Sequence, residues 1–302
     1  MPFLSKDLKE LHTLRDFVRW GASCFNDAKL FFGHGTDNAI DEAVALMLHA
    51  LHLAPNLPDS LWACHLTSSE KQRIATLFQR RIDERIPAPY LTHEAWFAGF
   101  SFYVNENVLI PRSPIAELIE QQFDPWIESD SIQNVLEIGT GSGCIAIATA
   151  LHLPHTTVDA IDISPQALEV ATQNRETYDL QDRLQLFEGD LFEPIKNKKY
   201  DLIICNPPYV DVAEMNALPP EYRHEPRLAL EAGEDGLDIV KRILKQAHRH
   251  LKPNGLLIIE VGFSQQALLE TYPQVDFIFP TFKRGGDGVF LLSEPQLKGY
   301  SF

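Results

Sequence analysis

The spacing of hydrophobic residues changes along the chain. Up to about residue 85, apolar residues recur every three or four positions, which predicts amphipathic helices. Thr67 and Glu70 have the spacing of a capping box at the start of one such helix, and Pro87 predicts its end. The other periodic stretches are Leu8, Leu11, Leu14, Phe17 and Val18, and then residues 41–53. We therefore expect a helical domain over residues 1–86.

Residues 90–111 have a different composition, because aromatic and β-branched residues dominate around Gly99 and around the polar stretch 105–107. This pattern predicts two strands joined by a turn. We expect residues 87–112 to form a β-hairpin that connects two domains.

From residue 113 onward, strand patterns and helix patterns alternate. Such alternation predicts right-handed βαβ units around a mostly parallel sheet, which is an α/β fold. A further strand at residues 288–292 could close one edge of the sheet. The other strands are predicted at residues 134–138, 158–163, 184–188, 202–205 and 256–261, with helices beginning at Gly143, Ser164 and Asp235.

Three glycines, Gly139, Gly141 and Gly143, stand at alternate positions after the first of these strands. Glycine at this point lets a ligand approach the backbone at a helix N-terminus. A dinucleotide site would need a further glycine at position 144, which is Cys144 here. The spacing therefore favours S-adenosylmethionine over a nicotinamide cofactor, although a tight turn without a ligand would use the same glycines.

Acidic residues end the next two strands. Asp162 lies about 20 residues beyond the glycines, where a carboxylate can bind both hydroxyls of a ribose. Asp190 could accept a hydrogen bond from an adenine amino group while Leu191 packs against the ring. A helix cap or a loop charge is the alternative interpretation of Asp190.

The sequence Asn206-Pro207-Pro208-Tyr209 follows the apolar strand at 202–205. A planar amide nitrogen is a poor nucleophile, because its lone pair is delocalised into the carbonyl group. The Asn206 side-chain oxygen and the Pro207 carbonyl could bind its two hydrogens and position the nitrogen for methyl transfer. The prolines stiffen the loop, and the Tyr209 ring could sandwich a flat substrate group. A proline-rich strand exit with a packing tyrosine is the alternative.

Charge and cysteine content narrow the function classes. The net charge is -16, most of it in residues 113–302, which argues against a basic nucleic-acid surface. The four cysteines form no C-x-x-C pair, so we expect neither a disulfide framework nor a metal site, and a cytoplasmic location. The first residues reach Lys6 and Asp7 before any apolar core, and no later stretch approaches 18 apolar residues, so we expect no leader and no membrane span.

Together, the glycine loop, Asp162, Asp190 and the Asn-Pro-Pro-Tyr sequence resemble the class I S-adenosylmethionine methyltransferases that modify planar nitrogens. Within them, nearly the whole chain is similar to the protein-glutamine N5-methyltransferases. The resemblance implies three parts: an N-terminal helical substrate-recognition domain at 1–86, a β-hairpin connector at 87–112 and a Rossmann-like catalytic domain at 113–302.

Two branches of that family modify either peptide release factors or large ribosomal subunit protein three. After residues 109–112 the release-factor branch typically continues Pro-Asp/Glu-Thr-Glu, whereas residues 113–118 here read Ser-Pro-Ile-Ala-Glu-Leu and resemble the ribosomal branch. Residues 90–92, 95–97, 141–148, 221–226 and 285–290 also resemble that branch. The resemblance therefore implies a glutamine of ribosomal protein three as the substrate, with a release factor as the alternative.

The resemblance also implies roles for individual residues. Glu137 stands where aspartate is common, and it could reach the glycine-loop amides or the methionine amine. Phe102 or Tyr103 could line the sulfonium side or belong to the core, and Arg112 could bridge the domains or be a solvated hinge charge. The implied catalytic residues are Asn206, Pro207, Pro208 and Tyr209. The implied cofactor residues are Glu137, Gly139, Thr140, Gly141, Gly143, Asp162, Asp190, Leu191 and Asn206.

Two further functions remain open from the sequence. The same Asn-Pro-Pro-Tyr loop serves DNA adenine and RNA guanine methyltransferases, although residues 113–302 lack a basic stripe. A noncatalytic ribosome-assembly factor could retain the fold for binding alone. The acidic catalytic region would attract a basic ribosomal protein over a long range, which favours the methyltransferase of that substrate.

Overall fold

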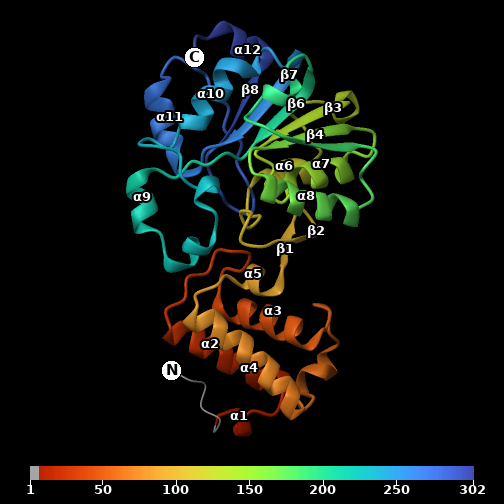
Figure 1. Cartoon of the computed structure of the whole chain (residues 1–302), viewed down its shortest axis with the longest axis vertical. Helices are drawn as coiled ribbons and strands as arrows, with labels where there is room; N and C mark the ends of the chain where they lie inside the picture. The colour runs from red at the N-terminus through yellow and green to blue at the C-terminus, as the bar shows by residue number, and fades with distance from the viewer. Residues whose placement is uncertain (1–6) are drawn as a thin grey trace. The chain divides into compact units, whose positions relative to one another are not determined.

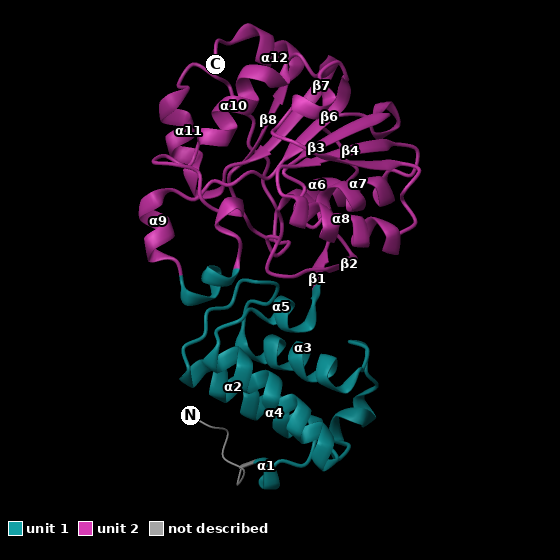
Figure 2. Ribbon diagram, in the orientation of Figure 1, with its two compact units in different colours: residues 1–94, 219–224 teal, residues 95–218, 225–302 magenta. Residues whose placement is uncertain are grey.

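The computed structural model describes residues 7–302, which form two compact units. Figure 2 shows them in different colours. Unit 1 contains the described residues up to Glu94 together with residues 219–224, and unit 2 contains residues 95–218 and 225–302. The expectation that no leader is present rests on the first residues, and residues 1–6 lie outside the described part. Among residues 7–302, no helix is long and apolar enough to cross a membrane.

Unit 1 is helical. Thr67 caps α4 by accepting a hydrogen bond from the Glu70 amide, and the Glu70 carboxylate binds the Thr67 amide, which confirms the predicted capping box. Phe17, Phe25 and Phe78 lie at the centre of its apolar core. Its elements are α1 (Asp7–Glu10), α2 (Leu14–Asp27), α3 (Ala39–Leu51), η1 (Asp59–Ala63), α4 (Ser68–Asp83), α5 (Ala88–Thr92) and η4 (Pro220–His224).

A buried ion cluster holds the segment 219–224 within unit 1. Glu221 of this segment accepts hydrogen bonds from Arg81 at 3.2 Å and from Arg85 at 3.4 Å. Arg81 also donates to Glu42 at 2.6 Å, and both of these side chains are 1% exposed. Because each buried charge has a partner of opposite sign, the cluster avoids the large cost of an isolated charge.

Unit 2 contains a six-stranded sheet with the order β5-β4-β3-β6-β7-β8. Five strands are parallel, and β8 pairs antiparallel with β7 at the edge, as the sequence predicts for a mostly parallel sheet. Ile138 of β3 pairs with both Ile161 of β4 and Cys205 of β6, so these three strands end side by side. The strands are β3 (Asn134–Ile138), β4 (Thr157–Asp162), β5 (Leu184–Glu188), β6 (Tyr200–Cys205), β7 (Leu251–Glu260) and β8 (Val289–Ser293).

Helices cover both faces of this sheet. Successive strand residues point to opposite faces, so Val135 belongs to one apolar cluster and Leu136 to the other. Figure 1 shows α6, α7 and α8 on one side and α10, α11 and α12 on the other. The helices of unit 2 are α6 (Ile115–Glu120), η2 (Ser129–Ser131), α7 (Cys144–His152), α8 (Pro165–Thr177), η3 (Glu193–Ile195), α9 (Val212–Ala217), η5 (Arg227–Ala229), α10 (Asp238–Ala247), η6 (Gly262–Ser264), α11 (Gln265–Thr271) and α12 (Glu294–Gly299).

The predicted hairpin forms over a shorter stretch than residues 90–111. Strands β1 (Glu94–Phe97) and β2 (Phe100–Tyr103) pair with each other and are joined through Gly99. Residues 88–92 form the short helix α5, because Pro89 is compatible with its first turn and four of its residues are buried. The polar stretch at 105–107 lies beyond the hairpin.

Replacing Arg81 by leucine should destabilise unit 1 by about 3–5 kcal/mol, because Glu42 and Glu221 would keep buried charges without their main partner. Arg80 is the neighbouring residue of α4, and its pair with Glu84 is about half exposed. Arg80→Leu should therefore cost less than about 1 kcal/mol. Urea denaturation of both variants measures the difference, and equal losses would contradict the role of the buried cluster.

Candidate functional site

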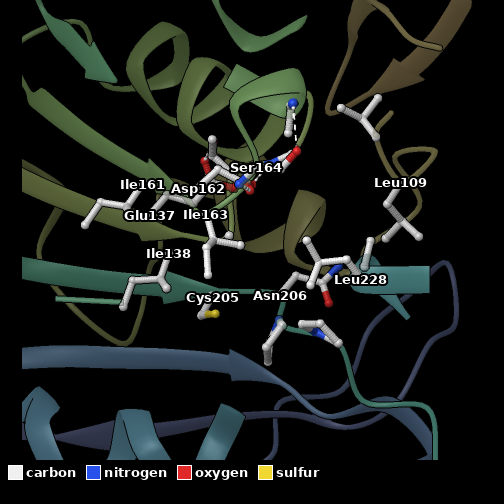
Figure 3. Close-up of a pocket in the computed structure, with 18 of the residues that line it drawn as sticks. Leu109, Glu137, Ile138, Ile161, Asp162, Ile163, Ser164, Cys205, Asn206 and Leu228 are labelled. Carbon is white, nitrogen blue, oxygen red and sulfur yellow. Dashed lines mark hydrogen bonds between the residues drawn. The ribbon is translucent and has the colours of Figure 1, made fainter. Parts of the chain in front are cut away.

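A pocket of about 240 Å³ lies in unit 2 at the carboxyl ends of β3, β4 and β6. Figure 3 shows it from close range. The loops after β3, β4, β5 and β6 form its wall together with residues 107–113 and 226–231. From β3 the chain adds β4 and β5 on one side of the sheet, and it then returns to add β6, β7 and β8 on the other side, so the strand order reverses between β3 and β6. Open α/β sheets bind ligands at such a switch point. The predicted site residues that line it are Arg112, Glu137, Gly139, Thr140, Gly141, Asp162, Asp190, Leu191, Asn206, Pro207 and Pro208.

The loop between β3 and α7 presents its backbone to the pocket. Gly139 and Gly141 have φ angles of +72° and +55°, which glycine adopts without strain. A Cβ atom on either residue would meet no described atom within 4 Å, so the loop borders open space. Gly143 does not line the pocket. A Cβ there would lie 3.1 Å from Ile147 and 3.3 Å from Ala171, so Gly143 allows α7 to pack closely against α8.

Asp162 is the last residue of β4, and it is 9% exposed. Its two carboxylate oxygens accept hydrogen bonds from the Gly141 amide at 2.8 Å and from the Ser164 amide at 2.9 Å. Burial raises the pKa of Asp162, and these two bonds oppose that effect. Each oxygen has a second lone pair, so the carboxylate can hold the glycine loop and still accept a ligand hydroxyl.

Glu137 is buried where β3 approaches its end. Its carboxylate accepts hydrogen bonds from the Thr140 hydroxyl and from the Ala146 amide in the first turn of α7. Burial, together with the negative charge of Asp162, raises the pKa of Glu137 to about 8, against the lowering effect of the two donors. The length of the side chain lets it reach the Ala146 amide at the start of α7.

Asp190 and Leu191 follow β5 and line the pocket. The Asp190 carboxylate accepts a hydrogen bond at 2.5 Å from Arg242 of α10, which lines the same pocket. This ion pair joins the loop after β5 to α10. The sequence gives no sign of it, because 52 residues separate the partners.

Asn206, Pro207 and Pro208 line the pocket directly after β6. Figure 3 shows Asn206 near the end of this strand, together with Leu228. The Asn206 side-chain oxygen is buried, and none of the described residues donates a hydrogen bond to it. A buried acceptor without a donor is costly, so this oxygen is prepared for a ligand with an N–H or O–H group.

Besides Gly143, three predicted site residues do not line the pocket. The Tyr209 hydroxyl donates a hydrogen bond to Glu260 at 2.9 Å, and its ring packs against Gly262. Phe102 is 1% exposed and belongs to the core, where its ring packs against that of Tyr178. The backbone of Tyr103 forms hydrogen bonds in both directions with Asn174. Of the two interpretations of Phe102, a wall of the cofactor site or a core residue, the structure supports the core residue.

Arg112 pairs with a second part of unit 2. Its guanidinium donates to both carboxylate oxygens of Glu225, at 2.6 and 2.8 Å, and Glu225 also accepts the Ile110 amide at 3.0 Å. Such a bidentate pair fixes both position and orientation. It ties the pocket segment 107–113 to the residue that directly precedes the segment 226–231, and spacing along the chain could not reveal this partner of Arg112.

The chain is similar to known methyltransferases. Residues 121–218 match the family model described as the methyltransferase small domain. The chain is 50% identical to the ribosomal protein uL3 glutamine methyltransferase of Xanthomonas campestris pv. campestris, over 97% of this chain and 94% of that protein. It is 49% identical to the protein of the same name from Xylella fastidiosa strain 9a5c, over 95% of this chain and 92% of that protein.

A solved structure shows the fold. The catalytic domain of hMettl16, in complex with an RNA hairpin, superimposes with a TM-score of 0.51 at 21% sequence identity. The superposition covers 74% of this chain and 80% of that chain. This likeness confirms the class I methyltransferase fold that the sequence predicts.

Replacing Gly141 by alanine should weaken S-adenosylmethionine binding by about tenfold or more, because the Cβ would occupy the open space beside the loop. Gly99→Ala is the matched control. Gly99 also has a positive φ, +86°, and its Cβ would likewise meet no described atom within 4 Å, but it lies outside the pocket. Calorimetric titration should show a loss for Gly141→Ala alone, whereas a loss of equal size in both variants would contradict this role.

Proposed function

This chain belongs to the family of ribosomal protein uL3 glutamine methyltransferases, and we propose that it methylates the side-chain nitrogen of a glutamine in ribosomal protein uL3. The cofactor is S-adenosylmethionine, which supplies an electrophilic methyl group when bound. The observation that carries the proposal is the buried Asn206 oxygen, which lacks a donor among the described residues and belongs to a residue that lines the pocket.

The pocket residues fit this cofactor. The open space beside Gly139 and Gly141 leaves room for a ligand against the backbone. We propose that Asp162 binds the ribose hydroxyls, that Asp190 and Leu191 hold the adenine, and that Glu137 lies beside the methionine part. Arg242 keeps the Asp190 carboxylate in place through their ion pair. This assignment uses one carboxylate for each polar part of the cofactor.

The loop after β6 would hold the glutamine amide. We propose that the Asn206 oxygen and the Pro207 carbonyl accept the two amide hydrogens, which fixes the nitrogen and favours its pyramidal form. Both prolines restrict the backbone, so these acceptors need little reordering when the substrate binds. As the new N–C bond forms, the methyl–sulfur bond of the cofactor would break and its electron pair would stay on sulfur. The methylated nitrogen, which is then positively charged and acidic, would release its proton to water, so the chain needs no strong base for this step.

The charge of the chain suits a basic protein substrate. The net charge is -16, and Glu231 stands in the pocket wall. Opposite charge accelerates association and makes it sensitive to ionic strength. We propose the cytoplasm as the location of the reaction, in line with four free cysteine thiols. We also propose substrate recognition as the role of the helical unit 1.

Incubation with S-adenosylmethionine labelled in its methyl group tests the substrate. Purified uL3, a peptide release factor and RNA are supplied separately and in the same amounts. We expect label in uL3, and mass spectrometry should place the added methyl group on one glutamine. Label only in the release factor or only in RNA would refute the proposed substrate.

Asn206→Ala should lower kcat by about a hundredfold or more, because the lost acceptor acts on the nitrogen in the transition state. The affinity for S-adenosylmethionine should change much less than kcat does. Asn216→Ala is the matched control, since Asn216 is exposed on α9. Steady-state kinetics with calorimetric titration measure both quantities, and an unchanged kcat in Asn206→Ala would refute the role.

A further inference from the structure

The buried carboxylate of Glu260 in unit 2 contacts the loop of residues 206–209 without lining the pocket itself. Glu260 is the last residue of β7, and it is 4% exposed. One of its oxygens accepts a hydrogen bond from the Tyr209 hydroxyl at 2.9 Å, and the other accepts one from the Ser113 hydroxyl at 2.5 Å. Glu260 therefore joins two separate loops, of which one carries Asn206 and the other carries Arg112.

Tyr209 is held at three points of its structure. Besides the bond from its hydroxyl to Glu260, its backbone carbonyl accepts a hydrogen bond from the Ser264 hydroxyl at 2.8 Å. Its ring lies so close to Gly262 that a Cβ there would approach within 2.5 Å of the ring. These contacts fix the end of the loop opposite to Asn206.

We propose that Glu260 is a positioning residue of the methyl transfer, which holds the Asn206–Tyr209 loop in place through the Tyr209 hydroxyl. Tyr209 then anchors the loop from outside the pocket and does not stack on the substrate. This inference rests on the proposed function of the same loop.

The stiffness of the loop between Asn206 and Tyr209 explains how a hydrogen bond at Tyr209 would affect Asn206. Pro207 and Pro208 have fixed φ angles, so a shift of Tyr209 is transmitted toward Asn206 with little loss. A displacement of about 1 Å at the reacting groups can lower the rate by about a hundredfold. Burial raises the pKa of Glu260, against the hydroxyl donors and the charge of Arg112, so the carboxyl is kept there at a cost.

Glu260→Ala should lower kcat by about tenfold to a hundredfold and change the affinity for S-adenosylmethionine by less than about threefold. Glu260→Gln should restore kcat to within about threefold of the wild type, since its amide can accept from Tyr209 and donate to Ser113. Hydrogen exchange of the amides in residues 206–218 should be faster in Glu260→Ala than in Glu260→Gln.

Glu117→Ala is the control for a general loss of stability. Glu117 is also a buried glutamate of unit 2, it accepts the amides of Lys283 and Arg284, and it does not line the pocket. The Glu117→Ala variant should leave kcat and the hydrogen exchange of residues 206–218 unchanged.

Tyr209→Phe is the second test, in case Glu260→Ala does not fold. This variant removes only the hydroxyl and keeps the ring. If the ring acted by stacking on the substrate, kcat would not change. We expect kcat to fall about as far as in Glu260→Ala, and the double variant should lose little more than either single variant.

Full activity of folded Tyr209→Phe, or slow exchange of the loop in Glu260→Ala, would overturn the inference. A wild-type protein that labels no glutamine would instead refute the proposed function, so the two failures are distinguishable.

Discussion

The parallel register at the centre of the sheet is the constraint on which the site depends. Because Ile138 pairs with both Ile161 and Cys205, three loops begin at the same level of the sheet. The backbone ladders therefore place the glycine loop, Asp162 and Asn206 around one pocket without direct bonds between all three. Hydrogen bonds such as that from the Gly141 amide to Asp162 then adjust the loops within this frame. A sheet built in this way tolerates changes in the loops while their starting points stay fixed.

Much of the fold and part of the site could be predicted from local patterns. Strand 134–138 has the predicted bounds, because its apolar run ends at a glycine that only a turn accommodates. The capping box at Thr67 is also predictable from a local pattern, since Thr67 and Glu70 lie within one helical turn. Asp162 ends one recognisable strand and Asn206 follows another, and parallel strands end together. Local chemistry is thus sufficient wherever the interacting groups are near in sequence or lie at equivalent strand ends.

The remaining features depend on partners that are far apart in the chain. Tyr209 and Glu260 are 51 residues apart, and Arg112 and Glu225 are 113 residues apart, so no periodicity relates them. The aromatic character of Phe102 fits a pocket wall as well as a core position, and only its packing decides between them. Buried polar pairs of this kind are specified by tertiary packing, which one sequence does not reveal.

The path of the chain has a consequence for how the two units can be separated. The chain passes between them three times, because residues 219–224 belong to unit 1 while both flanking stretches belong to unit 2. A fragment that ends at residue 94 would thus lack Glu221 and leave Arg81 with only part of its buried charge balance. Cleavage at a single peptide bond between residues 94 and 95 would not release either unit. Neither unit can therefore be exchanged with that of another protein as one continuous piece.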